Sequence, residues 1–305
     1  MNVDKKAKGL VTKKFNDFFY VNISEGNQLK EGVRFLCKSR KNVYFQKQVI
    51  VVGDEVIISE ISFKNKTAII ETLLERKNLF ERPSVANISN IYVIISAKEP
   101  QLNFSQVNKF LISAESLFVK VSLVLTKCDL INTQIKNQFI QRFESWGYFP
   151  KTLNLLEGNS YKYFLQELEK NKCSIFIGPS GVGKTTILNK IIPNLNNSTS
   201  PVSRKIKRGK NTTRNIELFS LSKNSYIVDT PGFNIPNLNI NNKLVINLFP
   251  ELRNQLFKES LNCKFRNCLH THEPGCALDK HLERYKYYKE LIDSSKNHHS
   301  QIQGD

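Results

Sequence analysis

The segment Gly178–Thr186 constrains the fold more than any other part of the sequence. It reads Gly-Pro-Ser-Gly-Val-Gly-Lys-Thr-Thr and fits G-x-x-x-x-G-K-[ST], the pattern of a loop that holds nucleotide phosphates. The apolar run Cys173–Ile177 before it predicts a buried strand, and residues 185–192 after it predict the first turns of a helix. Glycines let backbone N–H groups turn toward phosphate oxygens, and the helix N-terminus adds favourable partial charge. The sequence therefore predicts a nucleoside triphosphate site in an α/β domain.

Each position of this loop is a candidate ligand of the nucleotide. Lys184 is expected to reach the β- and γ-phosphates, and Thr185 is expected to hold Mg²⁺. The alternative is a glycine-rich turn before an ordinary helix, but the strand and helix predicted on either side favour the phosphate loop. The predicted nucleotide-binding positions are Gly178, Pro179, Ser180, Gly181, Val182, Gly183, Lys184, Thr185 and Thr186.

A second pattern, Thr126-Lys-Cys-Asp129, follows an apolar strand and is similar to the [NT]-K-x-D motif that reads guanine. The carboxylate of Asp129 can accept hydrogen bonds from N1–H and N2–H₂ of guanine, and adenine offers no such pair of donors. The stem of Lys127 is expected to lie over the base. We predict that Thr126, Lys127, Cys128 and Asp129 bind the base; the alternative is a solvated turn at the end of a strand. A second base loop is expected at residues 153–158, with Asn154-Leu155 where Ser-Ala is usual.

The segment Asp229-Thr-Pro-Gly232 follows another apolar strand and supplies candidates for the Mg²⁺ side of the site. Asp229 offers a carboxylate, and the backbone N–H of Gly232 can sense the γ-phosphate. In the basic loop that precedes this strand, Thr213, or Thr212 beside it, is expected to ligate Mg²⁺ when GTP is bound. The alternative for this loop is a solvated basic segment. Phe233 occupies the position where many GTPases carry a water-orienting Gln, and Phe cannot orient a water molecule.

The N-terminal residues read as an all-β module. Short apolar runs alternate with turn signals and predict a small closed barrel, with an oligonucleotide-binding (OB) barrel as the leading choice. Basic and aromatic residues interleave between Lys38 and Lys47, which suits RNA binding; the alternative is that the aromatics fill the barrel core. The predicted barrel strands lie at residues 18–21, 33–36, 49–52, 56–58 and 67–70.

After a linker predicted at residues 73–83, the pattern changes to strands that alternate with helices. Residues 91–95 and 121–125 predict buried strands, and residues 104–118 place apolar side chains at helical spacing. Alternation of this kind indicates a parallel sheet that is covered by helices.

Cysteines and a histidine cluster near the C-terminus. Three thiolates and one imidazole within fourteen residues can close a tetrahedral zinc site with a structural role. His272 is an alternative ligand to His270, and scattered cysteines without metal are the alternative interpretation. Beyond the cluster we expect a helix at residues 282–292 and a disordered polar end. In that helix Arg284, Lys286 and Lys289 suit RNA contact or an ordinary amphipathic helix equally well. The predicted zinc ligands are Cys263, Cys268, His270 and Cys276.

The charge balance favours a polyanionic partner. The chain of 305 residues has 45 Lys and Arg against 27 Asp and Glu, a formal net charge of +18, and such an excess suits nucleic acid. The alternative is a Lys-rich chain with solvated faces. The N-terminus lacks the apolar region of a signal peptide, and no apolar run approaches the ~18 residues of a membrane helix. We therefore expect a soluble, cytoplasmic protein.

The motifs occur in a permuted order. The guanine motif precedes the phosphate loop, and Asp229–Gly232 comes last, so we predict a circularly permuted GTPase domain. With the cysteine spacing, this order resembles the ribosome small-subunit-dependent GTPase A family (RsgA, also called YjeQ). The resemblance covers nearly the whole chain. Its residues include Val52-Gly-Asp54, Arg82-Pro83, Thr126–Asp129, Gly178–Thr186, Arg208–Thr213, Asp229–Gly232, Phe249-Pro-Glu-Leu252 and Glu273-Pro-Gly-Cys276.

The resemblance implies an OB barrel at residues 1–75, a GTPase domain at 76–240 and a zinc-binding α domain at 241–305. It also implies GTP hydrolysis during late maturation of the small (30S) ribosomal subunit, stimulated by that subunit, with rRNA as a partner. We expect the protein to act as a monomer. Lys184, Thr213 and Asn211 are the candidate catalytic residues; Asn211 stands where the family usually has His and can orient a water by hydrogen bonding. Two rival hypotheses are an RNA-binding module that keeps guanine nucleotide as a structural ligand, and a regulatory GTPase unconnected to ribosomes.

Overall fold

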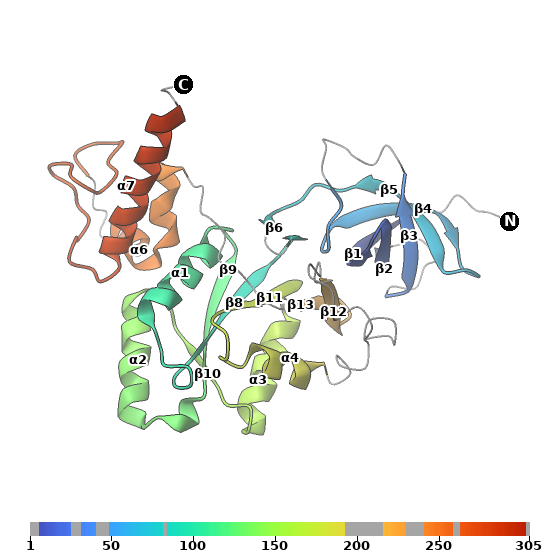
Figure 1. The fold of residues 1–305 in the computed structure, drawn as a ribbon, viewed down its shortest axis with the longest axis horizontal. Coiled ribbons are helices and arrows are strands. Elements are labelled where there is room, and N and C mark those ends of the chain that lie inside the picture. The colour runs from blue at the N-terminus through green and yellow to red at the C-terminus, as the bar shows by residue number, and fades with distance from the viewer. Residues whose placement is uncertain are drawn as a thin grey trace.

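The computed structural model describes residues 6–25, 32–40, 49–81, 84–192, 216–229, 241–258 and 263–302. Figure 1 shows a strand-rich N-terminal module on one side, a central sheet with helices around it, and helices α6 and α7 beyond the central part. This arrangement confirms the predicted order of barrel, α/β domain and helical C-terminal segment.

The N-terminal module is a closed barrel. Antiparallel pairs join β1 to β2, β2 to β3 and β4 to β5, whereas β3 and β5 run parallel. Pairing of β4 with β1, from Ala7↔Ile58 to Leu10↔Glu55, closes the barrel. Fully buried side chains such as Val21, Phe35 and Ile70 fill it. The described barrel strands are β1 (Ala7–Phe15), β2 (Phe18–Glu25), β3 (Arg34–Ser39), β4 (Glu55–Ser62) and β5 (Thr67–Leu73).

Two details of the predicted barrel are wrong. Its first strand is β1, which the sequence did not indicate, because lysines interrupt the apolar residues of this segment. Residues 49–52, predicted as a strand, form a connection in which only Val52 makes an isolated bridge, to Val85. The N–H of Val51 donates to the carboxylate of Asp54 at 2.8 Å instead of joining a strand. Local side-chain bonding of this kind competes with strand pairing.

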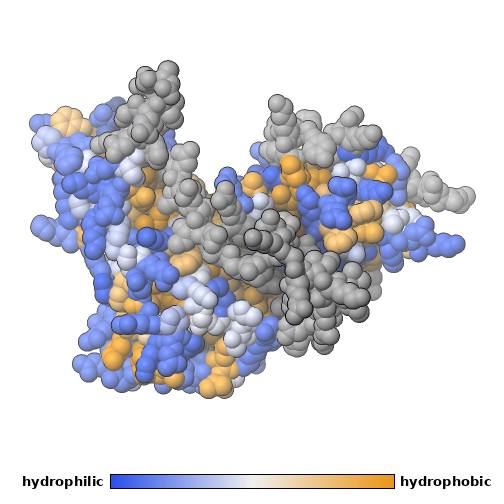
Figure 2. Space-filling view, viewed as in Figure 1, coloured by the Kyte–Doolittle hydropathy of each residue, from blue (hydrophilic) through white to orange (hydrophobic). Residues whose placement is uncertain are grey.

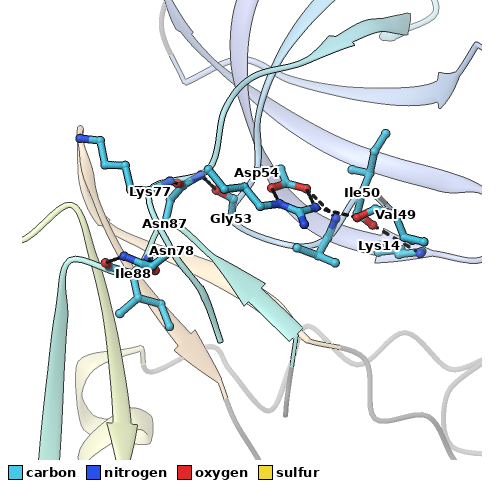
Figure 3. Close-up of polar contacts among 11 residues, drawn as sticks. Lys14, Val49, Ile50, Gly53, Asp54, Lys77, Asn78, Asn87 and Ile88 are labelled. Atoms are coloured by element: carbon cyan, nitrogen blue, oxygen red, sulfur yellow. Dashed lines mark hydrogen bonds and ion pairs between the residues drawn. The ribbon is translucent and has the colours of Figure 1, made fainter. Parts of the chain in front are cut away.

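A buried ion pair holds the barrel to the segment that follows it. The side chain of Asp54 is fully buried and receives two hydrogen bonds from the guanidinium of Arg76, at 2.6 and 2.7 Å. Beside it, the Asn87 amide donates to the Gly53 carbonyl (Figure 3). The predicted linker at 73–83 is therefore partly structured: β6 (Leu79–Glu81) pairs with β7 (Ser84–Ala86), while Arg82-Pro83 lies outside the described residues.

The central sheet has the order β10-β9-β8-β11-β13-β12. Its strands run parallel, except that β12 is antiparallel to β13. The strand predictions at 91–95, 121–125 and 173–177 are confirmed. The strands are β8 (Asn90–Ser96), β9 (Lys120–Thr126), β10 (Lys151–Leu153), β11 (Cys173–Ile177), β12 (Glu217–Ser222) and β13 (Ser225–Asp229).

Helices cover both faces of this sheet and bury two apolar clusters. Side chains of α1 and α2 pack on one face, and those of α3 and α4 pack on the other. The barrel residues Leu10 and Val52 belong to the first cluster, so the barrel shares core with the central domain. The predicted helix at 104–118 is confirmed but ends earlier. These helices are α1 (Phe104–Glu115), α2 (Thr133–Ser145), α3 (Gly158–Glu169) and α4 (Lys184–Ile191).

The C-terminal segment consists of η3 (Asn242–Leu248), α6 (Pro250–Lys258), the Cys/His segment and α7 (Tyr285–Ile302). Helix α7 begins later than predicted and continues to Ile302, so the expectation of a disordered end from residue 293 is wrong. Arg284 is fully buried. It donates to Asn108 at 2.7 Å and to Glu251 at 3.0 Å, which excludes it from RNA contact.

No helix among the described residues combines the length and apolar character needed to cross a bilayer. On the face drawn in Figure 2, hydrophilic residues are widespread and hydrophobic residues occur in several separate groups. Isolated apolar groups are normal on protein surfaces.

Candidate nucleotide site and Cys/His centre

The loop at residues 178–183 connects the end of β11 to the start of α4, as predicted. Gly178 has φ +142° and is buried; an added Cβ would lie 2.0 Å from the carbonyl oxygen of Ile94 in the neighbouring strand β8. Gly181 and Gly183 have φ +81° and +98°, values that favour glycine. The sequence therefore needs glycines here both for close approach to β8 and for the turn into α4.

Lys184 is the first residue of α4, and its side chain folds back over the loop. Its Nζ donates to the carbonyl oxygens of Gly178 at 2.7 Å and Pro179 at 2.5 Å. Burial lowers the pKa of Lys184, because the charged ammonium loses water. Thr185 and Thr186 are exposed on the first turn of the helix. A cation and hydroxyl groups are thus present at the N-terminus of a helix, which is where phosphate oxygens bind.

The guanine motif lies against this loop. The hydroxyl of Thr126, at the end of β9, is 2.7 Å from the carbonyl oxygen of Val182 and 3.0 Å from that of Ile95. The Nζ of Lys127 donates to the Gly181 carbonyl at 3.1 Å and also to that of Glu99. The fold therefore brings two motifs together that are separated by about fifty residues in the sequence.

Asp129 lies in the short helix η2 (Cys128–Leu130) and is exposed. Together with Cys128 it lines a cavity of about 490 Å³ that extends between β10 and α3. The second base loop lies at this cavity: the Asn154 side-chain amide donates to Glu157 at 3.1 Å, and its oxygen accepts from the N–H of Leu156 at 3.0 Å. Sequence reasoning missed other lining residues because no motif marks them, among them Lys136, Lys151, Tyr163 and Glu167.

Of the residues predicted near Mg²⁺ and the γ-phosphate in the two segments after the phosphate loop, only Asp229 is among the described residues. Asp229 is the last residue of β13, and its backbone pairs with Glu217 of β12. Strand β13 lies next to β11, so its end reaches the same edge of the sheet as the phosphate loop. Asn211, Thr213, Gly232 and Phe233, as well as Thr212, lie outside the described residues.

The predicted zinc ligands converge. The ligand atoms of Cys263, Cys268, His270 and Cys276 all lie within 4.8 Å of one another. Nδ1 of His270 lies 3.4 Å from Sγ of Cys263 and 3.5 Å from Sγ of Cys276. In a tetrahedral zinc site with Zn–S near ~2.3 Å, neighbouring ligand atoms are about 3.6 Å apart, so these distances fit. The alternative ligand His272 is not part of this cluster.

Backbone groups support the cluster from outside. The N–H of His270 donates to Sγ of Cys268, and the N–H of Ala277 donates to Sγ of Cys263, each at 3.4 Å. N–H donors stabilise thiolate, the form that binds metal. The carboxylate of Glu273 accepts from three backbone N–H groups, which lowers its pKa to about 2 against the cost of desolvation. The loop is thus fixed in the conformation that gathers the four ligands.

Comparisons with known proteins agree with this arrangement. A family model described as RsgA GTPase matches residues 73–239. A Small ribosomal subunit biogenesis GTPase RsgA from Prochlorococcus marinus strain NATL2A is 38% identical over 303 residues, covering 97% of this chain and 96% of the relative. A relative with the same name from Synechococcus sp. strain CC9605 is 36% identical over 259 residues, covering 85% and 84%.

Two solved structures share the fold. YloQ, described as a circularly permuted GTPase, has a TM-score of 0.75 and 25% identity and covers 96% of each chain. YjeQ from Thermotoga maritima has a TM-score of 0.76 and 25% identity, with coverage of 95% of this chain and 98% of that one. These similarities span all the modules described above.

Proposed function

The chain belongs to the RsgA GTPase family, and on this premise we propose that it hydrolyses GTP while assisting late maturation of the small (30S) ribosomal subunit. One observation carries the nucleotide part: the side chains of Thr126 and Lys127 bond to carbonyl groups of the phosphate loop. Asp129 is thereby held in one unit with Lys184, so base recognition and phosphate binding act on the same ligand. The name shared by the relatives supports the subunit as partner.

We assign the guanine base to Thr126–Asp129 and the phosphates to Gly178–Thr186. The cavity at Asp129 gives space for a purine, and Asp129 is exposed to it without a competing ion pair among the described salt bridges. Lys184 supplies positive charge to the β- and γ-phosphates. Phosphoryl transfer depends mainly on positioning and on neutralising charge, so these contacts are the chief contribution of the chain.

The residues present fit a magnesium ion that binds together with GTP. Mg²⁺ prefers oxygen ligands, and the exposed hydroxyl of Thr185 lies beside the phosphate loop. We propose that Thr185 and Thr213 hold the ion, with Asp229 on the same side, bound through water. When bound, the ion neutralises phosphate charge. We further propose that Gly232 senses the γ-phosphate and that Asn211 orients the attacking water.

We propose one zinc ion per chain at Cys263, Cys268, His270 and Cys276. The distances among the ligand atoms and the N–H donors to sulfur support this assignment. All four positions of a tetrahedral ion would be filled by protein, so the role is structural. The proposed modules are then a barrel at 1–75, a GTPase domain at 76–240 and a zinc domain at 241–305.

We propose that the barrel contacts rRNA. Along β2 and β3, the guanidinium of Arg34 lies 4.2 Å from the ring centroid of Tyr20, and Nζ of Lys38 lies 4.9 Å from that of Phe18. Cations beside aromatic rings serve both phosphates and stacked bases. With a net charge of +18, affinity for the subunit should fall steeply with salt. We propose a monomer that acts in the cytoplasm, where ribosomes are assembled, and that does not bind membranes.

The test is GTP turnover titrated with purified small subunits. We expect stimulation by the subunit, loss of turnover in Lys184→Ala, and wild-type turnover in Lys162→Ala, which removes an exposed lysine of α3. The same titration with Asn211→Ala tests the proposed water-orienting role. Binding to subunits without any stimulation of turnover would overturn the proposal and favour an RNA-binding module that keeps guanine nucleotide as a structural ligand.

A further inference from the structure

One row of residues continues from the barrel into the strands of the central sheet. Strand β1 contains a bulge between Val11 and Lys13 and then pairs with β12 at Lys13↔Glu217 (Figure 1). Within the β12–β13 hairpin, Glu217 also pairs with Asp229. Because neighbouring strands are ~4.8 Å apart, this row connects the barrel to the last residue of β13 within about 10 Å. Glu217 is the middle residue of the row.

Two cations of the barrel hold the Glu217 carboxylate. Lys13 of β1 donates to one oxygen at 2.6 Å, and Arg34 of β3 donates to the other at 3.1 Å. The Glu217 side chain is 17% exposed, so its carboxylate is partly shielded from water, whereas Arg34 is exposed and its pair with Glu217 is screened like other surface pairs. Arg34 also lies over the ring of Tyr20. In the described chain the β1–β12 ladder has a single residue pair, so the ion pairs contribute much of its alignment.

The same cations are available to a polyanion. The side chain of Arg34 is 42% exposed and that of Lys13 is 25% exposed. A phosphate group that docks on β2 and β3 can therefore bind Arg34 and compete with Glu217 for it. Arg binds phosphate well because its planar fork donates two parallel hydrogen bonds. A phosphate bound to Arg34 would thus change the charge balance at Glu217, which pairs with Asp229 in the hairpin.

We propose that Glu217 is a positioning residue that couples RNA engagement of the barrel to strand β13 and its terminal Asp229. The inference rests on the proposed function and names the residue through which the subunit acts on hydrolysis. Glu217 itself touches neither nucleotide nor RNA. Its carboxylate aligns the barrel with β12, and through the Glu217–Asp229 pair it sets the position of the end of β13.

A second inter-domain ion pair gives a matched control. Glu55 of β4 accepts from Lys8 of β1 at 3.1 Å and from Lys172, which directly precedes β11. Like Glu217, it is a partly buried carboxylate held by two cations. Only Lys172 lies on the other module, whereas both cations that hold Glu217 do. Lys172, however, lies at the end of β11 opposite the phosphate loop. Removal of this charge loosens the same two modules without touching the row that contains Asp229.

The experiment compares Glu217→Gln, Glu55→Gln and the exchanged pair Lys13→Glu/Glu217→Lys in the full chain. GTP turnover is measured with and without small subunits, and subunit binding is measured by co-sedimentation. For Glu217→Gln we expect the ratio of stimulated to basal kcat to fall about 10-fold, while KM for GTP stays within about 2-fold. Glu55→Gln should keep the wild-type ratio. The exchanged pair should restore part of it, because the ion pair between positions 13 and 217 forms again with its charges reversed, although Arg34 then faces a lysine at position 217.

Several outcomes would overturn the inference. If small subunits stimulate GTP turnover by Glu217→Gln as strongly as by the wild type, Glu217 does not couple the barrel to β13. An equal fall for Glu55→Gln would show that any loosening of the two modules has the same effect. Loss of subunit binding by Glu217→Gln would make the residue part of the docking surface instead. If wild-type protein binds subunits and is not stimulated, the proposed function fails first, and this result is distinguishable because it does not depend on any variant.

Discussion

Removal of the Asp54 carboxylate, in Asp54→Ala, tests whether the buried pair with Arg76 holds the barrel in place. Asp54 is fully buried and the Arg76 side chain is 11% exposed. The carboxylate also accepts from the N–H of Val51, and Arg76 donates to the carbonyl of Val49 at 2.6 Å. The substitution therefore leaves a nearly buried guanidinium without its counter-ion and a backbone N–H without its acceptor.

The magnitude follows from these contacts. Breaking a buried, hydrogen-bonded ion pair by removing one partner costs about 3–5 kcal/mol. At about 1.4 kcal/mol per tenfold change, the opening equilibrium of the barrel should rise by roughly 10²- to 10³-fold or more. Asp54→Asn keeps an acceptor for Val51 and should cost less. The matched control is Arg40→Ala, which removes an ion pair to Glu60 whose side chains are 51% and 52% exposed and costs about 0–1 kcal/mol.

Native-state hydrogen exchange is the suitable assay, because it measures local opening. Peptides from β1, β4 and β5 should exchange faster in Asp54→Ala, and peptides from α7 should not change. Fluorescence cannot replace this measurement, since the single tryptophan, Trp146, is buried at the junction with the C-terminal segment. Barrel exchange in Asp54→Ala no faster than in Arg40→Ala would refute the role assigned to the buried pair.

Further predictions concern the ionisable groups of the site and its surroundings. Burial raises the pKa of Glu115 to about 7 from 4.5, so the folded state loses stability as pH rises from 4.5 through 7. The free energy of unfolding of Glu115→Gln, measured with urea, should therefore exceed that of the wild type by up to about 3 kcal/mol at pH 8 and by little at pH 4.5. A difference between the two proteins that does not change with pH would contradict this. Asp129→Asn offers an amide donor in place of an acceptor, so in competition binding GTP should lose about 10-fold or more in affinity and xanthosine triphosphate should gain. Chelation of zinc, or Cys268→Ser, should raise hydrogen exchange across residues 263–292 while the barrel exchanges as before; unchanged exchange after verified zinc loss would count against a structural ion.

Much of the central domain could be predicted because its strands are buried on both faces. Cys173–Ile177 is a continuous apolar run next to a glycine loop, and the predicted strand has the bounds of β11. The Cys/His cluster was also readable, because residue type and spacing are local properties of the sequence. The same holds for the guanine motif, whose place at a strand end followed from the apolar run before it.

Features that depend on long-range packing could not be predicted. Strand β1 contains lysines at positions 8, 13 and 14, and its pairing with β12 joins residues 204 positions apart. Arg284 resembles an exposed helix residue, but it is buried because Glu251 and Asn108 supply its partners. Its guanidinium also lies 4.8 Å from the ring centroid of Phe249. Single-residue patterns do not reveal such partners, since each comes from a different element.

The permuted order places the barrel beside the hairpin that ends at Asp229. Permutation moves the hairpin β12–β13 late in the chain, yet the sheet places it beside β1, the first strand. The chain joins the barrel to β8 through residues 74–89. Its link to the β12–β13 hairpin is noncovalent and includes the ion pairs of Glu217 with Lys13 and Arg34. Such contacts must offset the entropy of closing a long loop, and a few kcal/mol can form or break them. A covalent linker does not have this property. The contacts between β1 and β12 at Lys13 and Glu217 are therefore the place where binding of RNA can alter the end of β13 without unfolding either module.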